Sequence, residues 1–173
     1  MTLASKIAKM IKAKTLHTTE FDFVTVQIVV RARFFVNIVL FFMSKIISAG
    51  MVGDGLAIKP SNETVCAPVF GKITVLMEDS KHAVGMTLSN GVEILIHVGI
   101  DTVSMGGEGF SYLVKVGDVV KAGTPLLKFS REKIKAAGHP DTAVFVVTNP
   151  NGVSFKFNAG QEAKTGKTII ATY

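Results

Sequence analysis

The sequence predicts an all-β fold, an antiparallel β-sandwich or barrel with repeated hairpins and one short helix. Two observations predict this class. Downstream of Met51, short apolar segments alternate with glycine-marked turns, a spacing typical of sandwiches and barrels. The chain also has 173 residues, 48% hydrophobic content and 16 glycines, which suits one compact domain with a sizeable core and many tight turns.

Composition divides the chain near residue 50. Residues 1–50 contain β-branched and aromatic runs without clear turn signals, and we expect an atypical N-terminal segment there, either a divergent strand region or a linker. Residues 51–173 form the predicted main domain. The net charge of +6 is concentrated in the N-terminal segment, and the main domain is nearly neutral. Because it lacks a basic patch interleaved with aromatic residues, nucleic-acid binding gains little support.

The membrane signals of the chain lie in the same N-terminal segment. The apolar run at residues 34–44 is too short to span a bilayer and too deep in the chain for a usual signal peptide. Residues 1–16 place apolar side chains near helical spacing with lysines opposite, a pattern that can lie on an anionic membrane surface. An ordinary surface helix or a frayed terminus is the simpler interpretation, and peripheral membrane contact stays the alternative.

Within the main domain, two segments predict a repeated hairpin-like unit. Residues 114–129 and residues 157–170 each contain two glycines six positions apart, followed by a pair of adjacent aliphatic residues. The predicted helix lies between these segments, with Ser130 as its N-cap, Gly138 as its stop and Pro140 just beyond. The single cysteine, Cys66, excludes an internal disulfide, is compatible with a reducing compartment, and is interpreted as a small apolar filler.

Two histidines are the candidate functional residues. If Asn90 and Gly91 form a two-residue type I′ hairpin turn, Val84 faces His97 and His82 faces Gly99. The two imidazoles are then diagonal neighbours on one face of the sheet, within side-chain reach, and Gly99 offers no side chain to crowd His82. Alternation also separates two faces of the His97 strand. The predicted core side comprises Val92, Ile94, Ile96, Val98 and Ile100, so we expect His97 on a mixed surface rather than in the deep core.

Paired imidazoles suit two kinds of chemistry. Neutral imidazole is a good nucleophile, so a histidine can accept a phosphoryl group while a second imidazole donates a hydrogen bond to the phosphoryl oxygens. Imidazole nitrogen also binds zinc, but even a catalytic zinc site requires a third protein ligand, and no H-E-x-x-H or H-x-H motif is present. The residues alone favour phosphoryl transfer and leave a zinc hydrolase as the alternative.

Several motifs in register point to a known family. They are GDGLAIKP (53–60), VCAPVFGKI (65–73), KHAVG (81–85), GVEILIHVGIDTV (91–103), GEGF (107–110) and VKVGDVVKAGTPLLKF (114–129). Their order and spacing resemble the glucose-family enzyme IIA domain of the bacterial phosphoenolpyruvate-dependent sugar phosphotransferase system. The resemblance covers about residues 51–173 and is strongest up to residue 134. Upstream, the chain lacks the Pro-Asp pair and the aromatic residue usual in the family, so no residue is carried over there.

The resemblance implies an antiparallel β-sandwich with a shallow active depression. His97 would accept the phosphoryl group from the histidine-containing phosphocarrier protein and pass it to a cysteine on the enzyme IIB domain of a sugar permease. His82 would stabilise the phosphoryl group and support the onward transfer. Asp101 matches the family's acid beside the site, and Ser80 keeps a hydroxyl near His82 where members often have threonine.

We expect neither a cofactor nor a metal for this reaction. Family members are cytoplasmic, either free-standing or fused to their permease, and the fused ones are membrane-associated. Some free-standing members regulate other proteins by binding them in the unphosphorylated form. A regulatory binding module on the same scaffold is thus a second alternative for this chain.

Overall fold

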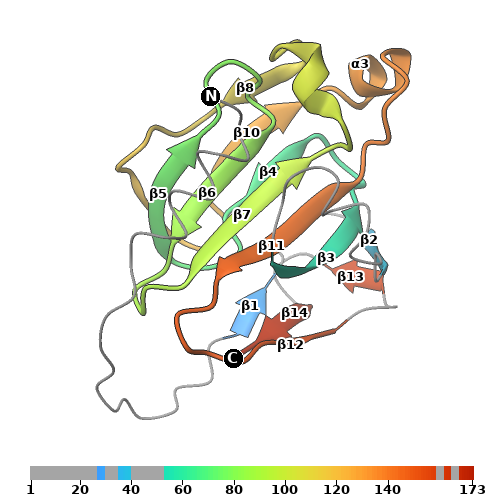
Figure 1. Ribbon diagram of the computed structural model, residues 1–173. Coiled ribbons are helices and arrows are strands. Elements are labelled where there is room, and N and C mark those ends of the chain that lie inside the picture. Colours follow the sequence, from blue (N-terminus) through green and yellow to red (C-terminus); the bar gives the residue numbers. More distant parts are fainter. Residues whose placement is uncertain (1–26, 30–34, 40–52, 159–161, 165–167) are drawn as a thin grey trace.

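Strands dominate the computed structural model of the chain, which describes residues 27–29, 35–39, 53–158, 162–164 and 168–173 (Figure 1). The strands are β1 (Gln27–Val29), β2 (Phe35–Val39), β3 (Asp54–Lys59), β4 (Thr64–Cys66), β5 (Gly71–Leu76), β6 (Ala83–Thr87), β7 (Glu93–Val98), β8 (Phe110–Tyr112), β9 (Val119–Val120), β10 (Pro125–Phe129), β11 (Ala143–Asn149), β12 (Lys156–Phe157), β13 (Glu162–Lys164) and β14 (Ile169–Thr172). The helices are a 3-10 turn at Thr102–Met105 (η1) and α3 at Arg131–Ala136.

The strands form antiparallel sheets packed in layers. The long sheet has the order β13-β2-β3-β11-β7-β6-β5-β9, and two three-stranded sheets have the orders β4-β10-β8 and β1-β14-β12. Figure 1 shows β5, β6, β7 and β11 side by side, with the β4-β10-β8 sheet behind them. The predicted all-β antiparallel sandwich is therefore confirmed.

One face of the long sheet packs on the β4-β10-β8 sheet to form the main core. Ile94, Ile96 and Val98 of β7 project into this core because alternate side chains of a strand share a face. Their partners across the core include Leu127 and Phe129 of β10. Full burial of an aliphatic side chain stabilises the fold by about 1.5–3 kcal/mol, so this face is the chief source of stability.

The short helix lies where the sequence predicts it. Ser130 is the N-cap of α3, and its Oγ accepts a hydrogen bond from the Lys133 backbone N–H at 3.3 Å. The helix ends at Ala136, and Gly138 follows with φ 79°, a left-handed conformation that terminates helices. The predicted cap and stop are both confirmed.

The predicted hairpin-like units are wrong in one respect: their turns join strands of different sheets. In the first unit, β9 pairs with β5 in the long sheet, whereas β10 pairs with β4 and β8. In the second, β13 pairs with β2, whereas β14 pairs with β1 and β12. In the first unit Gly117 and Gly123 lie in turns as predicted, whereas the glycines of the second unit lie outside the described residues. A turn lets the chain cross to the opposite layer as readily as fold back on itself.

Two strands from the N-terminal segment pair with strands of the main domain, each in a different sheet. β2 pairs with β3 and extends the long sheet, and β1 pairs with β14. The predicted amphipathic helix at residues 1–16 lies outside the described residues, and the division at residue 50 stays a prediction. Among the residues that the structure describes, no helix is long and apolar enough to cross a membrane.

Candidate functional site

His82 and His97 lie against each other. Their ring centroids are 4.4 Å apart, and the ring planes meet at 78° in an edge-to-face arrangement. His97 is on β7, and His82 is the last residue before β6, the neighbouring strand. The expected contact between the two imidazoles is confirmed.

The register that brings them together differs from the predicted one. Leu88 N–H donates to Val92 O and Gly91 N–H donates to Leu88 O, so the hairpin loop has three residues rather than two, with Gly91 at φ 81°. As a result Ala83, not Val84, lies opposite His97. The predicted pairing was therefore wrong by one position.

His82 contacts His97 because the regular alternation of side chains along β6 does not extend back to His82. Continued alternation from Ala83 would place the His82 side chain on the core face. However, β6 begins only at Ala83, and Lys81 has a left-handed φ of 51°, so the backbone turns just ahead of His82. The chain turn, rather than the strand, directs the ring toward its partner.

Both histidines are more buried than the sequence predicts. His82 is 1% exposed and His97 is 5% exposed, whereas a mixed surface was expected. On their face of the sheet, Ala83, Leu95, Val144 and Val146 form a second, smaller hydrophobic cluster. Ile100, expected on the core side, packs against this smaller cluster, because Gly99 at φ 79° interrupts the alternation.

Burial keeps both imidazoles neutral. The pKa of His82 is lowered to about 4 by burial, although a hydrogen bond with the Ser80 backbone opposes the shift. The pKa of His97 is lowered to about 3, mainly by burial and also by the neighbouring His82, although a hydrogen bond with the Gly99 backbone opposes the shift. Nε2 of His82 and Nδ1 of His97 are buried and have no hydrogen-bond partner among the described residues. At neutral pH the site therefore holds two uncharged rings, each with an unsatisfied nitrogen.

The loop that carries His82 is fixed by two hydroxyl groups. Ser80, which is itself buried, places its Oγ 2.7 Å from His82 Nδ1, as expected. Tyr112 of β8 accepts a hydrogen bond from Met77 N–H at 2.8 Å and donates one to Ala83 O at 2.7 Å. Tyr112 thus holds both ends of the loop, a role that local sequence patterns do not reveal because the contacts span about thirty residues.

The end of the His97 strand requires glycine. At Gly99 a Cβ atom would collide with Thr102 Cγ2 and approach Pro140 O to 3.2 Å, and the φ of 79° already disfavours other residues. Thr102 is fully buried, and its hydroxyl donates to Val98 O at 2.7 Å. The predicted supporting residue Gly99 therefore acts through its backbone.

Asp101 lies close to His97 in the sequence, but its side chain does not bond to either imidazole ring. It is exposed, has a left-handed φ of 61°, and precedes η1. In the described part of the chain its carboxylate forms no hydrogen bond or ion pair with His82 or His97, so a direct contact in this state is not seen. Nor do three or more His, Cys, Asp or Glu side chains cluster as metal ligands within those residues.

Cys66 lies at a different place, on the wall of an apolar cavity that Ile96 and Phe145 also line. Burial raises the pKa of its thiol, so the group stays protonated at neutral pH. Its neighbours and its protonation fit the interpretation of a filler residue.

Comparison with known proteins gives consistent results. A family model described as phosphoenolpyruvate-dependent sugar phosphotransferase system, EIIA 1, matches residues 42–153. The glucose-specific EIIA component of Halalkalibacterium halodurans is 43% identical over 123 residues, which cover 70% of each chain. The beta-glucoside-specific EIIBCA component of Bacillus subtilis is 44% identical over 110 residues, 64% of this chain but only 18% of that relative.

A solved structure agrees in fold as well. Glucose permease IIA from Mycoplasma capricolum matches with a TM-score of 0.71 and 27% sequence identity, covering 89% of this chain and 99% of that one.

Proposed function

The chain belongs to the EIIA 1 family of the phosphoenolpyruvate-dependent sugar phosphotransferase system, and from this membership we propose that it carries a phosphoryl group on His97. The observation that supports the choice of residue is the contact between two neutral imidazoles with unsatisfied ring nitrogens. A neutral ring keeps the lone pair that a nucleophile needs, and a protonated ring would not.

The proposed reaction has two steps. In the first, a ring nitrogen of His97 attacks the phosphorus of a phosphohistidine on the donor, so a new N–P bond forms as the donor N–P bond breaks. The donor imidazole leaves with the bonding electron pair and takes up a proton, while the phosphorylated ring of His97 gives up its N–H proton. In the second step a thiolate of the acceptor attacks the phosphorus, and an S–P bond forms as the His97 N–P bond breaks. His97 leaves with the bonding electron pair and regains a proton. Positioning and charge stabilisation supply most of the rate in such transfers.

His82 is proposed to stabilise the phosphoryl group. If the Ser80 hydroxyl donates to Nδ1 of His82 across their 2.7 Å contact, Nε2 carries the proton. That N–H is buried without a partner among the described residues, so it is free to donate to a phosphoryl oxygen. A hydrogen bond to a charged acceptor in a site of low dielectric is stronger than one in water.

The proposed donor is the histidine-containing phosphocarrier protein, and the proposed acceptor is the enzyme IIB domain of a sugar permease. The names of the B. subtilis and Corynebacterium glutamicum EIIBCA relatives support an acceptor of this kind. We place the reaction in the cytoplasm, and association with the membrane through the permease or the N-terminal segment is the alternative.

Burial of His97 favours one alternative function, a regulatory binding module. A ring that is 5% exposed offers a phosphorylated donor little surface, and a larger contact requires side chains packed on it to shift during docking. Without that shift the chain would act as a regulatory binding module on the same scaffold. This alternative predicts binding to partner proteins without phosphate turnover.

Intact-mass measurement tests the proposal. The protein is incubated with phosphoenolpyruvate, enzyme I and the phosphocarrier protein, and we expect one acid-labile phosphoryl group. His97→Ala should abolish it, whereas the matched control His139→Ala, at a partly exposed histidine that contacts Ser104, should retain it. Absence of phosphate on the intact protein would overturn the carrier function. Hydrolase activity that a chelator abolishes would support the zinc alternative.

A further inference from the structure

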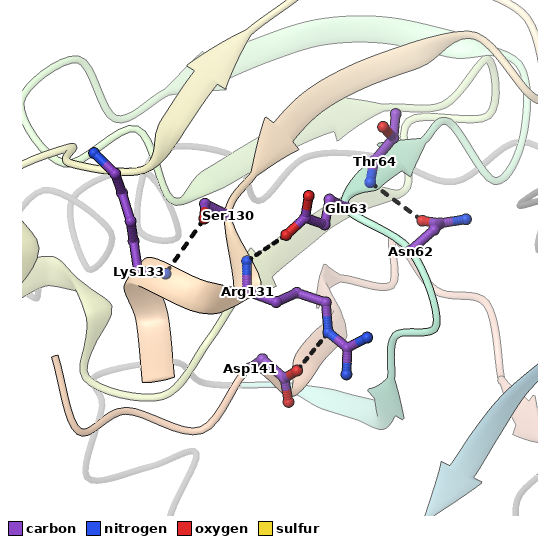
Figure 2. Close-up of polar contacts among 7 residues, drawn as sticks. All are labelled: Asn62, Glu63, Thr64, Ser130, Arg131, Lys133 and Asp141. Carbon is purple, nitrogen blue, oxygen red and sulfur yellow. Dashed lines mark hydrogen bonds and ion pairs between the residues drawn. The ribbon is translucent and has the colours of Figure 1, made fainter. Parts of the chain in front are cut away.

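An ion pair at the start of α3 lies close to the end of the His97 strand. Arg131 Nε donates to Asp141 Oδ2 at 2.6 Å, which ties the first residue of the helix to the segment that follows it (Figure 2). The Arg131 backbone N–H also donates to Glu63 Oε1 at 2.8 Å. The Asp141 side chain is only 10% exposed, so this ion pair is largely shielded from water.

The residues on either side of Asp141 hold the backbone just beyond His97. Thr142 O accepts a hydrogen bond from Gly99 N–H at 2.9 Å, and Pro140 O accepts one from Ile100 N–H at 3.1 Å. Asp141 therefore lies between the two carbonyl groups that fix the end of β7.

The backbone between those carbonyl groups and the His97 imidazole is closely packed. Gly99 is confined between Thr102 and Pro140, and Thr102 is itself bonded to Val98 O. On the adjacent strand β11, Val144 lies directly opposite His97. A displacement of residues 140–142 is therefore transmitted to Gly99 and from there to the ring two positions earlier.

We infer that Arg131 and Asp141 are positioning residues for His97, and that their ion pair holds the imidazole in the orientation for phosphoryl transfer. The inference rests on the proposed function of His97. Neither side chain touches the ring, so both act through the backbone hydrogen bonds of Thr142 and Pro140.

A second ion pair on the same helix provides a matched control. Lys133 Nζ lies 3.1 Å from Glu108 Oε1, but the two side chains are 54% and 71% exposed. Exposed pairs contribute little because water screens them. Lys133→Met thus removes a charge from α3 without touching the segment at Asp141.

The test compares Arg131→Met, Asp141→Asn and Arg131→Lys with Lys133→Met, each assayed well below its own melting temperature. We expect kcat for phosphoryl transfer from the phosphocarrier protein to fall roughly tenfold in the first two variants, with the KM for that protein unchanged. Arg131→Lys, which can still pair with Asp141, should recover most of the rate, and Lys133→Met should match the wild type. If one variant fails to fold, the other carries the test.

A second readout does not depend on phosphorylation. The ring ¹⁵N and ¹H resonances of His97 in the unphosphorylated protein should shift in Arg131→Met and Asp141→Asn, and not in Lys133→Met. Unchanged His97 resonances in folded variants overturn the inference, as does a lower rate that Arg131→Lys does not restore. A wild-type protein that takes up no phosphate overturns the proposed function instead, so the two failures are distinguishable.

Discussion

The two faces of β7 show how one strand serves both stability and chemistry. Ile94, Ile96 and Val98 face the main core, whose buried members are all apolar. Leu95 and His97 face the smaller cluster, and this histidine face also holds His82. Both faces are buried, but only the histidine face contains unsatisfied ring nitrogens.

The difference is therefore one of polarity rather than exposure. A buried polar group without a partner costs about 1–3 kcal/mol, and the main core offsets such costs at the histidine face. Substitutions on the main-core face should consequently cost the most stability, whereas substitutions of the two histidines should chiefly change phosphoryl transfer.

The largest effect is expected at His82. His82→Gln should leave phosphorylation of His97 nearly intact, because the glutamine amide can still donate to a phosphoryl oxygen. It should slow the transfer to enzyme IIB about a thousandfold, or about 4 kcal/mol of barrier, because an amide cannot exchange a proton as an imidazole can. Single-turnover discharge of the isolated phosphoprotein measures this step. Equal loss of both steps would mean that His82 has no separate role.

A paired truncation tests the contrast between the faces directly. Ile94→Ala should lower the free energy of unfolding by about 3–5 kcal/mol because it opens a cavity in the main core, and Leu95→Ala should lower it by about 2–3 kcal/mol in the smaller cluster. Urea denaturation gives both values. A larger loss of unfolding free energy in Leu95→Ala than in Ile94→Ala would contradict this difference between the two faces.

Acid should weaken the fold through the histidine face. Both rings have a pKa of 6.5 in the unfolded chain but about 4 and about 3 when folded. Between pH 6.5 and 4 the unfolded chain thus binds more protons, and stability falls as pH falls, by up to about 1.4 kcal/mol per pH unit for each ring. The double variant His82→Gln/His97→Asn should have a correspondingly shallower pH dependence, and an unaltered slope would show that the rings are not buried neutral.

The smallest effect is expected at Ser80. Ser80→Ala leaves Nδ1 of His82 without its hydroxyl partner and should cost about 0.5–1.5 kcal/mol of unfolding free energy, whereas Ser80→Thr keeps the hydroxyl and should be nearly neutral. Thermal melts of the two variants provide the comparison. A cost shared by both would point to packing rather than to the hydrogen bond.

Periodicity and motifs in the sequence predicted the sandwich, the short helix and the contact between the histidines. The pairing register was not predictable, because Asn90-Gly91 fits a two-residue turn as well as the three-residue loop that forms. The error matters little for the site, since the backbone turn at Lys81 redirects His82.

Burial and long-range contacts could not be predicted from local patterns. The low exposure of His97 depends on how Val144 and Val146 of β11 pack beside it, and β11 is almost fifty residues away in sequence. The roles of Tyr112 and Asp141 likewise depend on contacts between separate elements.

The most direct test of the central claim is localisation of the phosphoryl group by tandem mass spectrometry under alkaline conditions. After incubation with the phosphoenolpyruvate-driven donors, the phosphoryl group should be found on the peptide that contains His97 and at that ring. A phosphoryl group on His82 or on any other residue would contradict the assignment of His97 as the acceptor.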